Sequence, residues 1–419
     1  MSTDVDESSL RAQVRAFLAE QYDPQLTCRE WWRRLADSGW GIPTWPVEWF
    51  GRGMSADEGE IVRDEMANAG VLGAPSGAGV SMAGPVIMQY GTEEQKQRWL
   101  PALAYGLEQW GQFFSEPGAG SDLASVQTRA VRDGDEWVVN GQKVWNSGTL
   151  LADKALLVAR SDVDVPKHKG ITFFIFPVDQ PGVDIRPIKQ MNGYSEFNET
   201  FMTDCRVHDR DRLGPEGGGW AVALGILNHE RANHAGGGNH ELRSVAAGVK
   251  GGNLDRTVAE VLATKEEGPK SANALPIDTF DGLVSLAREY GRTGDPVIRQ
   301  KLASVYAMSE AMKWTAMRGQ AAAKLGRAGG AESSVAYLGG VFVVRKYRDL
   351  IGDLAGAYAQ LDGNELSESI TTAPCHGIQG GSEHVQRNVI GERALGLPRE
   401  PQVDKDLPFR LLRVGTQRD

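Results

Sequence analysis

The chain has 419 residues and a formal net charge of −10, from 45 basic and 55 acidic side chains. No run of lysine and arginine could follow a phosphate backbone, so we do not expect a nucleic-acid partner. The three cysteines are widely spaced and give neither a disulfide framework nor a cysteine-based zinc site, which favours a reducing, cytoplasmic setting. We also expect no signal peptide and no membrane span, because no apolar run approaches about 18 residues.

The first quarter of the chain is expected to be helical. Capping boxes, in which a serine or threonine precedes a glutamate or glutamine by three positions, occur at Ser55 and Glu58 and again at Thr92 and Gln95. Apolar residues also recur at helical spacing near the N-terminus. We therefore place an N-terminal helical domain at residues 1–108.

Residues 109–215 are expected to form a small antiparallel sheet or barrel. The stretches ALLVAR and GITFFIFPV have the length and composition of short buried strands. In EWVVNGQKVW, apolar residues flank Asn140 and Gly141, the dipeptide favoured in two-residue hairpin turns. This pattern predicts a tight hairpin at these two residues.

Helical periodicity returns in residues 216–419 and predicts a C-terminal helical bundle. The polar stretch 249–277 interrupts the pattern and is expected to be an insertion. Helices, then strands, then helices define an α+β fold. A Rossmann fold is excluded, because no βαβ alternation and no G-x-G-x-x-G after a strand is present.

The stretch ILNHERANHAGGG sets Glu230 between two histidines. His229 and His234 are five positions apart, which places them about 140° apart around a helix and makes a shared metal ion unfavourable. We therefore predict no metal site. The residues alone leave open whether Glu230 is a solvated surface carboxylate or a functional group.

A second polar stretch, SEPGAGSD at residues 115–122, is rich in loop-forming residues. Its glycines allow close approach of a ligand to the backbone, and Ser115 and Ser121 can donate hydrogen bonds. It is not a Walker loop, because no Gly-Lys-Ser/Thr follows. By itself the stretch is equally compatible with a plain turn.

Longer stretches resemble the acyl-CoA dehydrogenase flavoprotein family. The matching stretches are YGTEEQKQRWLPAL, QFFSEPGAGSDLASVQTRAVRDGDEWVVNGQKVWNSG, KHKGITFFIFPVDQPGVDIRPI and IQGGSEHVQRNVIGERALGLPRE. The resemblance covers nearly the whole chain and is weakest at residues 249–277. It implies an acyl-CoA dehydrogenase-like fold with an N-terminal helical domain, a central antiparallel β domain and a C-terminal helical bundle, the same order that the periodicity predicts.

The resemblance implies FAD as cofactor, bound between the β domain and the bundle. The implied cofactor-binding positions are Gln112, Phe114, Ser115, Gly120, Ser121, Trp145, Ser147, Gly380 and Ser382. An aromatic wall and short hydroxyls suit a planar heterocycle from which water is excluded. For Trp145, an ordinary position in the core of a hairpin remains the alternative.

The catalytic base of much of this family lies in the C-terminal signature, at a position that is Gly380 here and cannot take a proton. One subset, which includes steroid side-chain acyl-CoA dehydrogenase subunits, instead has the base in an Asn-x-Glu-Arg string on the first long C-terminal helix. The matching string NHER makes Glu230 the expected base. Burial of a carboxylate raises its pKa toward neutrality and makes it a competent base. The resemblance also implies substrate contacts for Ser121, Asn228 and Arg231, although Arg231 is equally compatible with the surface.

The implied reaction is FAD-dependent α,β-dehydrogenation of an acyl-CoA thioester in lipid or steroid β-oxidation, with electrons passed to an electron-transfer flavoprotein. A flavin-dependent oxidase or monooxygenase of the same fold and a non-catalytic subunit of a heteromer are the alternatives. In the family a neighbouring subunit clasps FAD through an Arg-x-x-Phe-Gly string and a glutamine followed by glycines. Here Arg292 matches only loosely, and AYAQLDGNELSES replaces the second string. We therefore expect a homo- or hetero-oligomer, a dimer or tetramer, whose FAD clasp is altered or supplied by a different chain.

Overall fold

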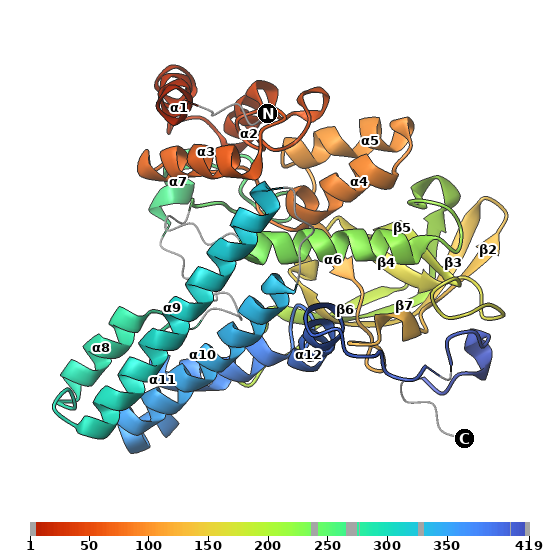
Figure 1. Ribbon diagram of the computed structural model, residues 1–419. Helices are drawn as coiled ribbons and strands as arrows, with labels where there is room; N and C mark the ends of the chain where they lie inside the picture. The colour runs from red at the N-terminus through yellow and green to blue at the C-terminus, as the bar shows by residue number, and fades with distance from the viewer. Residues whose placement is uncertain are drawn as a thin grey trace. The chain divides into compact units, whose positions relative to one another are not determined.

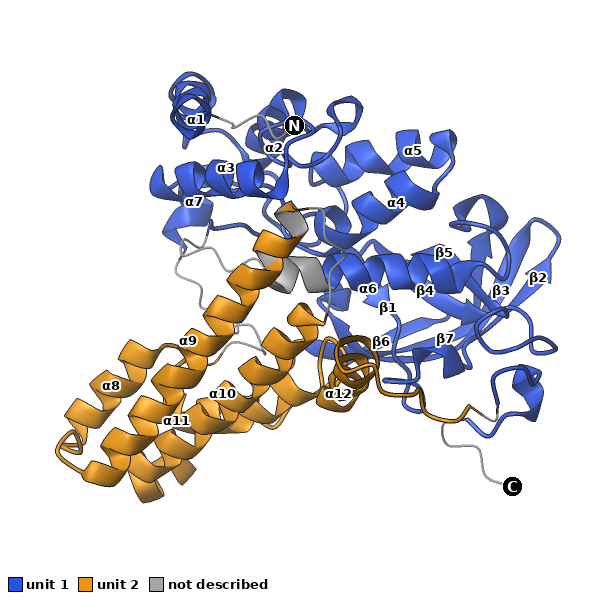
Figure 2. Cartoon of the chain, in the orientation of Figure 1, with its two compact units in different colours: residues 1–187, 197–267, 404–419 blue, residues 188–196, 268–403 orange. Residues whose placement is uncertain are grey.

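The computed structural model describes residues 6–235, 242–264, 275, 277–325, 331–402 and 404–414. The chain divides into two compact units (Figure 2). Unit 1 comprises residues 1–187, 197–267 and 404–419, and unit 2 comprises residues 188–196 and 268–403. The three domain boundaries expected from the sequence stay a prediction.

Unit 1 begins with a helical layer (Figure 1). Its helices are α1 (Glu7–Gln21), α2 (Cys28–Ser38), α3 (Ala56–Asn68), α4 (Gly84–Tyr90) and α5 (Glu93–Ala104). The predicted capping boxes are confirmed at the start of α3 and of α5, where the side chains of Ser55 and Thr92 accept backbone N–H groups three residues on. Trp31 and Trp32 on α2 are fully buried, and their indole N–H groups donate to the backbone carbonyls of Leu72 and Gly73.

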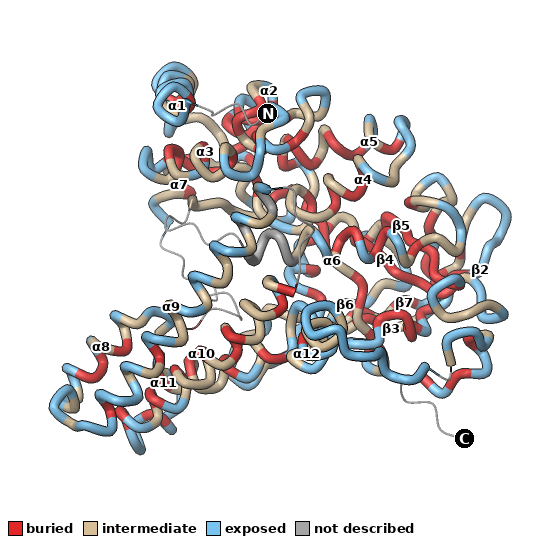
Figure 3. Tube along the Cα trace, in the orientation of Figure 1, coloured by how far each residue is buried: buried red, intermediate tan, exposed pale blue. Residues whose placement is uncertain are grey.

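One mixed sheet follows the helical layer. Its strands are β1 (Trp110–Phe113), β2 (Arg129–Asp133), β3 (Glu136–Ser147), β4 (Lys154–Arg160), β5 (Ile171–Pro177), β6 (Val183–Pro187) and β7 (Phe197–His208). The strand order is β1-β4-β2-β3-β7-β6, with β5 paired to β4. The predicted β domain is confirmed, and most of its pairings are antiparallel, while β1 and β2 pair with β4 in parallel. Strands β4 and β5 are buried along almost their whole length (Figure 3).

The hairpin predicted at Asn140 and Gly141 is wrong. Strand β3 runs straight through these residues and pairs with β7 on both sides of them. The hairpin turn lies instead at residues 134–135, between paired Asp133 and Glu136, where Gly134 supplies a φ of 66°. Asn140 marks a β-bulge, and its side chain exchanges two hydrogen bonds with Asp204 on β7.

Two further helices belong to unit 1, namely α6 (Gly219–Ala235) and α7 (Val258–Ala263). Helix α6 lies along β5 and α4 and buries Val222, Ala223 and Ile226. Helix α7 buries Val258 and Val261 against the tryptophan-rich core of the first helices. Residues 249–264 of the expected insertion therefore contribute to the core of unit 1.

The C-terminal segment 404–414 returns to the sheet of unit 1. The backbone N–H groups of Phe409 and Arg410 donate to the carbonyls of Val165 and Val163 at 2.9 and 3.0 Å. The Phe409 ring is 5% exposed and lies 3.7 Å from the guanidinium carbon of Arg160. This segment covers one end of strand β4.

Unit 2 is a helical bundle, as predicted. Its helices are α8 (Phe280–Glu289), α9 (Pro296–Lys324), α10 (Glu332–Ala355), α11 (Glu365–Thr372) and α12 (Glu383–Val389). Helices α8, α9 and α10 pack through a common apolar core. The loop 188–196, which joins β6 to β7, also belongs to unit 2, because the Tyr194 hydroxyl donates to Glu368 on α11 at 2.9 Å. No helix in the described part of the chain has both the length and the apolar character that crossing a membrane requires.

Candidate active site

The end of strand β1 and the middle of strand β3 are held together by main-chain and side-chain hydrogen bonds. The Gln112 carbonyl accepts from Asn146 Nδ2 at 2.9 Å, and the Ser115 carbonyl accepts from the Val144 N–H at 2.9 Å. Phe114 is buried and packs edge-to-face against a phenylalanine of β5. Three predicted cofactor-binding residues thus lie beside the segment that carries Trp145.

Trp145 is pushed out of the sheet by a bulge. Lys143 pairs with Thr200 and Asn146 with Asn198, so two residues of β3 face a single residue of β7. Trp145 takes a left-handed backbone conformation with φ of 63°, and its side chain is 57% exposed. Such a conformation is uncommon for a bulky residue and points to a constraint at this position. Trp145 is therefore not a core residue of the sheet.

The glycine loop beside this bulge presents an open backbone. Gly120, Ser121 and Ser147 are exposed. A Cβ added to Gly120 would meet no atom within 4 Å. This edge of unit 1 therefore combines an exposed aromatic face with hydroxyl groups and accessible backbone, a donor set that fits a flat, polar-edged heterocycle.

A buried ion pair lies under the glycine loop. Lys143 is fully buried, and its ammonium group donates to Glu116 at 2.8 Å and to the Phe114 carbonyl at 2.9 Å. Burial raises the pKa of the Glu116 carboxyl, but Lys143 and two backbone N–H groups outweigh burial and hold it below its usual value. Glu116 is therefore ionised at neutral pH.

A second buried cation supports the far end of the loop. Arg160 is 2% exposed and donates to the carbonyls of Ala124 and Lys167, each at 2.5 Å. Burial lowers the pKa of its guanidinium to about 10, so it stays charged at neutral pH. Lys167 in turn pairs with Asp122 at 2.9 Å. These charged groups were not identified from sequence, although alternation from Trp137 and Val139 along β3 would have pointed Lys143 inward.

Glu230 lies on the inward face of helix α6. It follows Ile226 by four positions and Ala223 by seven, so it continues the stripe that packs on the sheet, and it is half-buried. His229 is also half-buried, and burial lowers the pKa of its imidazole. Asn228 is exposed. The side chain of Arg231, expected to contact substrate, lies outside the described part of the structure.

Gly380 and Ser382 belong to unit 2. Gly380 and Gly381 have φ of 63° and 91°, a region that disfavours any side chain. The Tyr337 hydroxyl hydrogen-bonds to the carbonyls of His376 and Gln379, which precede these two glycines in the chain. Burial raises the pKa of this tyrosine to about 12. The turn at Gly380 and Gly381 is therefore held by hydrogen bonds, and its backbone conformation favours glycine.

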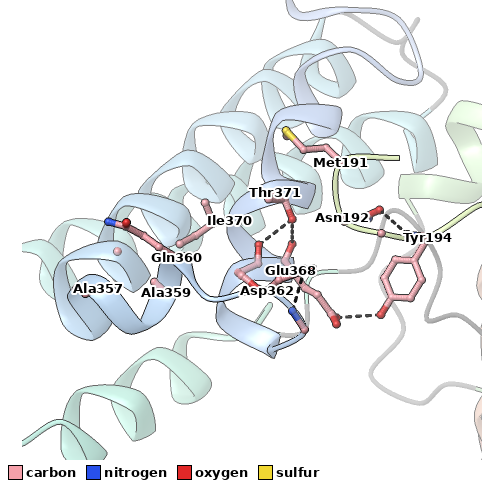
Figure 4. A pocket seen from close by; sticks show the side chains of 15 residues that line it. Met191, Asn192, Tyr194, Ala357, Ala359, Gln360, Asp362, Glu368, Ile370 and Thr371 are labelled. Carbon is pink, nitrogen blue, oxygen red and sulfur yellow. Dashed lines mark hydrogen bonds between the residues drawn. The ribbon is translucent and has the colours of Figure 1, made fainter. Parts of the chain in front are cut away.

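Unit 2 also contains a cavity of about 900 Å³ between the loop 188–196 and the start of α11 (Figure 4). The expected replacement of the FAD clasp, AYAQLDGNELSES, supplies much of its wall. Two of the lining residues are the acids Asp362 and Glu368, and none of the described lining residues is a lysine or arginine. Arg292, the loose match to the other clasp string, pairs with Asp295 at 2.7 Å.

No group of three or more histidine, cysteine or acidic side chains within the described ranges is arranged to hold a metal ion.

Comparisons with known proteins identify the class of this fold. Family models match three parts of the chain: acyl-CoA dehydrogenase N-terminal domain at residues 4–107, middle domain at 111–205 and C-terminal domain at 278–395. The chain belongs to the acyl-CoA dehydrogenase family, whose members are oxidoreductases that generally depend on FAD. The resemblance drawn from the sequence is confirmed.

Individual relatives extend this result. The acyl-CoA dehydrogenase IpdE1 of Mycobacterium tuberculosis is 34% identical over 421 residues, which cover 95% of this chain and 99% of that protein. A structure titled steroid ACAD, Tcur3481-Tcur3483, is similar with a TM-score of 0.67 at 28% identity. The match covers 94% of this chain and 98% of the chain in that structure. The ChsE4-ChsE5 complex from Mycobacterium tuberculosis has a TM-score of 0.66 at 29% identity, with coverages of 96% and 100%.

Proposed function

We propose that this chain removes the α-proton and β-hydride of an acyl-CoA thioester, with FAD as cofactor and Glu230 as base. The observation that carries the proposal is that Glu230 is half-buried and continues, by its spacing from Ala223 and Ile226, the buried stripe of α6. Gly380 stands where much of the family has its base, and its left-handed backbone favours glycine over a carboxylate side chain. Glu230 is thus the acid that matches the subset with an Asn-x-Glu-Arg string.

The residues of unit 1 that would hold FAD are Gln112, Phe114, Ser115, Gly120, Ser121, Trp145 and Ser147. The exposed Trp145 face and the hydroxyls next to it have the chemistry that such a ring system requires. When bound, FAD supplies an acceptor for the hydride that leaves the β-carbon. The family resemblance assigns Gly380 and Ser382 to FAD as well.

The protein's own contribution is to move one proton and stabilise one developing charge. A Glu230 carboxylate oxygen takes the α-proton, and negative charge builds on the thioester oxygen. Backbone N–H groups such as that of Gly380 are suited to stabilise this charge, because a glycine keeps its amide donor. Trp145 shields the reacting carbons from water, which strengthens these interactions.

The direct test is Glu230→Gln. A positioned general base contributes about 10² to 10⁴-fold, so the rate of flavin reduction by a good thioester should fall by at least about 100-fold while FAD stays bound. Glu94→Gln, which changes an exposed acid on α5, is the matched control and should leave the rate unchanged. Flavin reduction within tenfold of the wild type in Glu230→Gln would show that another group is the base.

The electron acceptor and the acyl group are also proposed here. We infer an electron-transfer flavoprotein as acceptor, and anaerobic reduction followed by exposure to air tests it. Slow reoxidation supports a dehydrogenase, whereas rapid reoxidation by O₂ supports an oxidase or monooxygenase. Because one similar structure is titled a steroid ACAD, bulky steroid thioesters belong in the screen beside straight and branched chains. Flavin bleaching identifies the substrate.

We further propose that the FAD clasp is supplied by a different chain. Two acids and no base among the described residues of the unit 2 cavity make a poor receptor for a pyrophosphate, and Arg292 is already paired. The similar ChsE4-ChsE5 structure is a complex of two proteins. Co-expression with a neighbouring homologous chain should raise the FAD content per chain. One FAD per chain in the purified homo-oligomer would exclude this arrangement.

A further inference from the structure

The buried Lys143 lies at the junction of three segments that form the proposed flavin edge. It is two residues before Trp145 on β3, and its ammonium group reaches the Phe114 carbonyl at 2.9 Å and Glu116 at 2.8 Å. The side chain is 0% exposed, so these contacts are made away from solvent. One cation therefore links the bulged strand to the end of β1 and to the start of the glycine loop.

Glu116 carries this link to the other end of the loop. Besides Lys143, its carboxylate accepts the backbone N–H groups of Gln127 at 2.6 Å and of Thr128 at 2.9 Å. Residues 116 and 128 thus meet at one carboxylate, and the intervening loop, which carries Gly120 and Ser121, is closed at its base. The loop geometry depends on this carboxylate staying ionised and in place.

Asn146 holds the other side of the bulge. It is 1% exposed and donates to the Gln112 carbonyl, while its own side-chain oxygen accepts from the Thr200 hydroxyl at 3.0 Å. Trp145 is therefore flanked by two buried polar anchors, Lys143 before it and Asn146 after it. These anchors account for the left-handed backbone conformation of Trp145 at the bulge of β3.

Stability alone does not explain a buried ion pair at this place. Replacing such a pair by apolar residues of similar volume is often neutral or stabilising, because desolvation of both charges offsets their attraction. A charged pair instead specifies one arrangement, since an ammonium group left without its carboxylate is strongly disfavoured. The arrangement specified here is that of the glycine loop relative to the bulge.

We propose that Lys143 is a positioning residue of the flavin edge, which through Glu116 fixes the glycine loop against the Trp145 bulge. The inference rests on the proposed function for the identity of the ligand, FAD. The arrangement itself is a property of the protein without ligand and can be measured there. Lys143 does not contact the reacting atoms and acts through Glu116 and the Phe114 carbonyl.

The test uses Lys143→Met and the double variant Lys143→Met/Glu116→Gln in the full chain. The single variant leaves a buried carboxylate unpaired, and the double variant removes both charges while keeping one amide oxygen as acceptor, where the carboxylate used one oxygen for each of the two backbone N–H groups. The controls are Glu65→Gln, which breaks the ion pairs of a buried carboxylate with Arg11 and Arg15 on α1, and Lys169→Met, which changes an exposed lysine. Thermal unfolding is measured for every variant.

Two readouts report on position rather than on stability. The Kd of the apoprotein for FAD comes from quenching of flavin fluorescence. The environment of Trp145 comes from ¹⁹F NMR of apoprotein labelled with 5-fluorotryptophan, with the resonance assigned by Trp145→Phe. In both Lys143 variants we expect the Kd to rise at least about tenfold and the Trp145 resonance to shift or broaden, where tenfold corresponds to about 1.4 kcal/mol.

The outcomes distinguish failure of the role proposed for Lys143 from failure of the proposed function. The double variant should regain much of the thermal stability that the single variant loses, but not its FAD affinity, and Glu65→Gln should lose stability without changing either readout. A double variant that binds FAD within about twofold of the wild type with an unchanged Trp145 resonance would overturn the proposal. If the wild-type chain binds FAD neither alone nor together with the co-expressed chain that supplies the clasp, the proposed function fails, and the Trp145 resonance of the apoprotein still decides the role of Lys143.

Discussion

Phe409→Ala is expected to release the C-terminal segment from unit 1. The ring is 5% exposed, and truncating a buried phenylalanine costs about 3–5 kcal/mol. The lower limit applies, because the apolar cluster here contains only Phe409, Leu412 and Val414 and water can refill the space. Loss of the contact with the Arg160 guanidinium at 3.7 Å adds on the order of 1 kcal/mol. The total is therefore about 3–4 kcal/mol.

Amide hydrogen exchange measures this loss where it occurs. A cost of about 3 kcal/mol corresponds to roughly 100-fold faster exchange of the Phe409 and Arg410 amides, which are bonded to the 163–165 carbonyls. Leu411→Ala is the control, since Leu411 is 61% exposed in the same segment, and it should change exchange by less than about threefold. If Phe409→Ala also stays below about threefold, the ring does not hold the segment and the reasoning is refuted.

Three further predictions concern stability. Hydrogen bonds from Arg212 depress the pKa of Asp209 to about 2, so its stabilising contribution is present above about pH 4 and is lost as the pH falls toward 2. In Asp209→Asn, the midpoint of urea unfolding should therefore change less with pH across this window than in the wild type. The same dependence of the midpoint on pH in both proteins would contradict the assignment. Gly380→Ala should lower the free energy of unfolding in urea by about 1 kcal/mol. The cost comes from the backbone φ of 63°, because the added Cβ has room, with the nearest Tyr337 atom at 3.7 Å. A gain in stability would argue against backbone strain. Glu65→Gln should cost about 1–2 kcal/mol in thermal unfolding, because Glu65 is 5% exposed while its partners Arg11 and Arg15 are 26% and 67% exposed; no measurable loss would show that the pair is weak.

Local signals were the parts of the fold that could be predicted from sequence. The capping boxes at Ser55 and Thr92 depend on residues three positions apart, so the sequence specifies them without knowledge of the fold. The order of helical and β regions follows from hydrophobic periodicity for the same reason. The hairpin at Asn140 and Gly141 was misplaced, because this dipeptide lies within β3 opposite a bulge of β7, where Asn140 faces both Thr203 and Asp204.

The site depends on contacts between distant residues, which one sequence does not reveal. The exposure of Trp145 requires a bulge defined by pairing with residues 198–200. The buried pair of Lys143 and Glu116 joins positions on different segments, and a lysine in a strand is ordinarily a surface residue. Family resemblance supplied Glu230, and the structure adds that this residue continues the buried face of its helix.

The contact between Phe409 and Arg160 has a consequence for synthesis of the chain on the ribosome. Arg160 emerges roughly 250 residues before its aromatic neighbour, so the Phe409 ring cannot cover this end of β4 until residue 409 has been made. Until then the guanidinium keeps its carbonyl partners at Ala124 and Lys167, and the face that the ring covers stays hydrated. Nascent chains halted before residue 404 should therefore expose the end of β4 to proteases and chaperones, and residues 404–414 cover it once they are made.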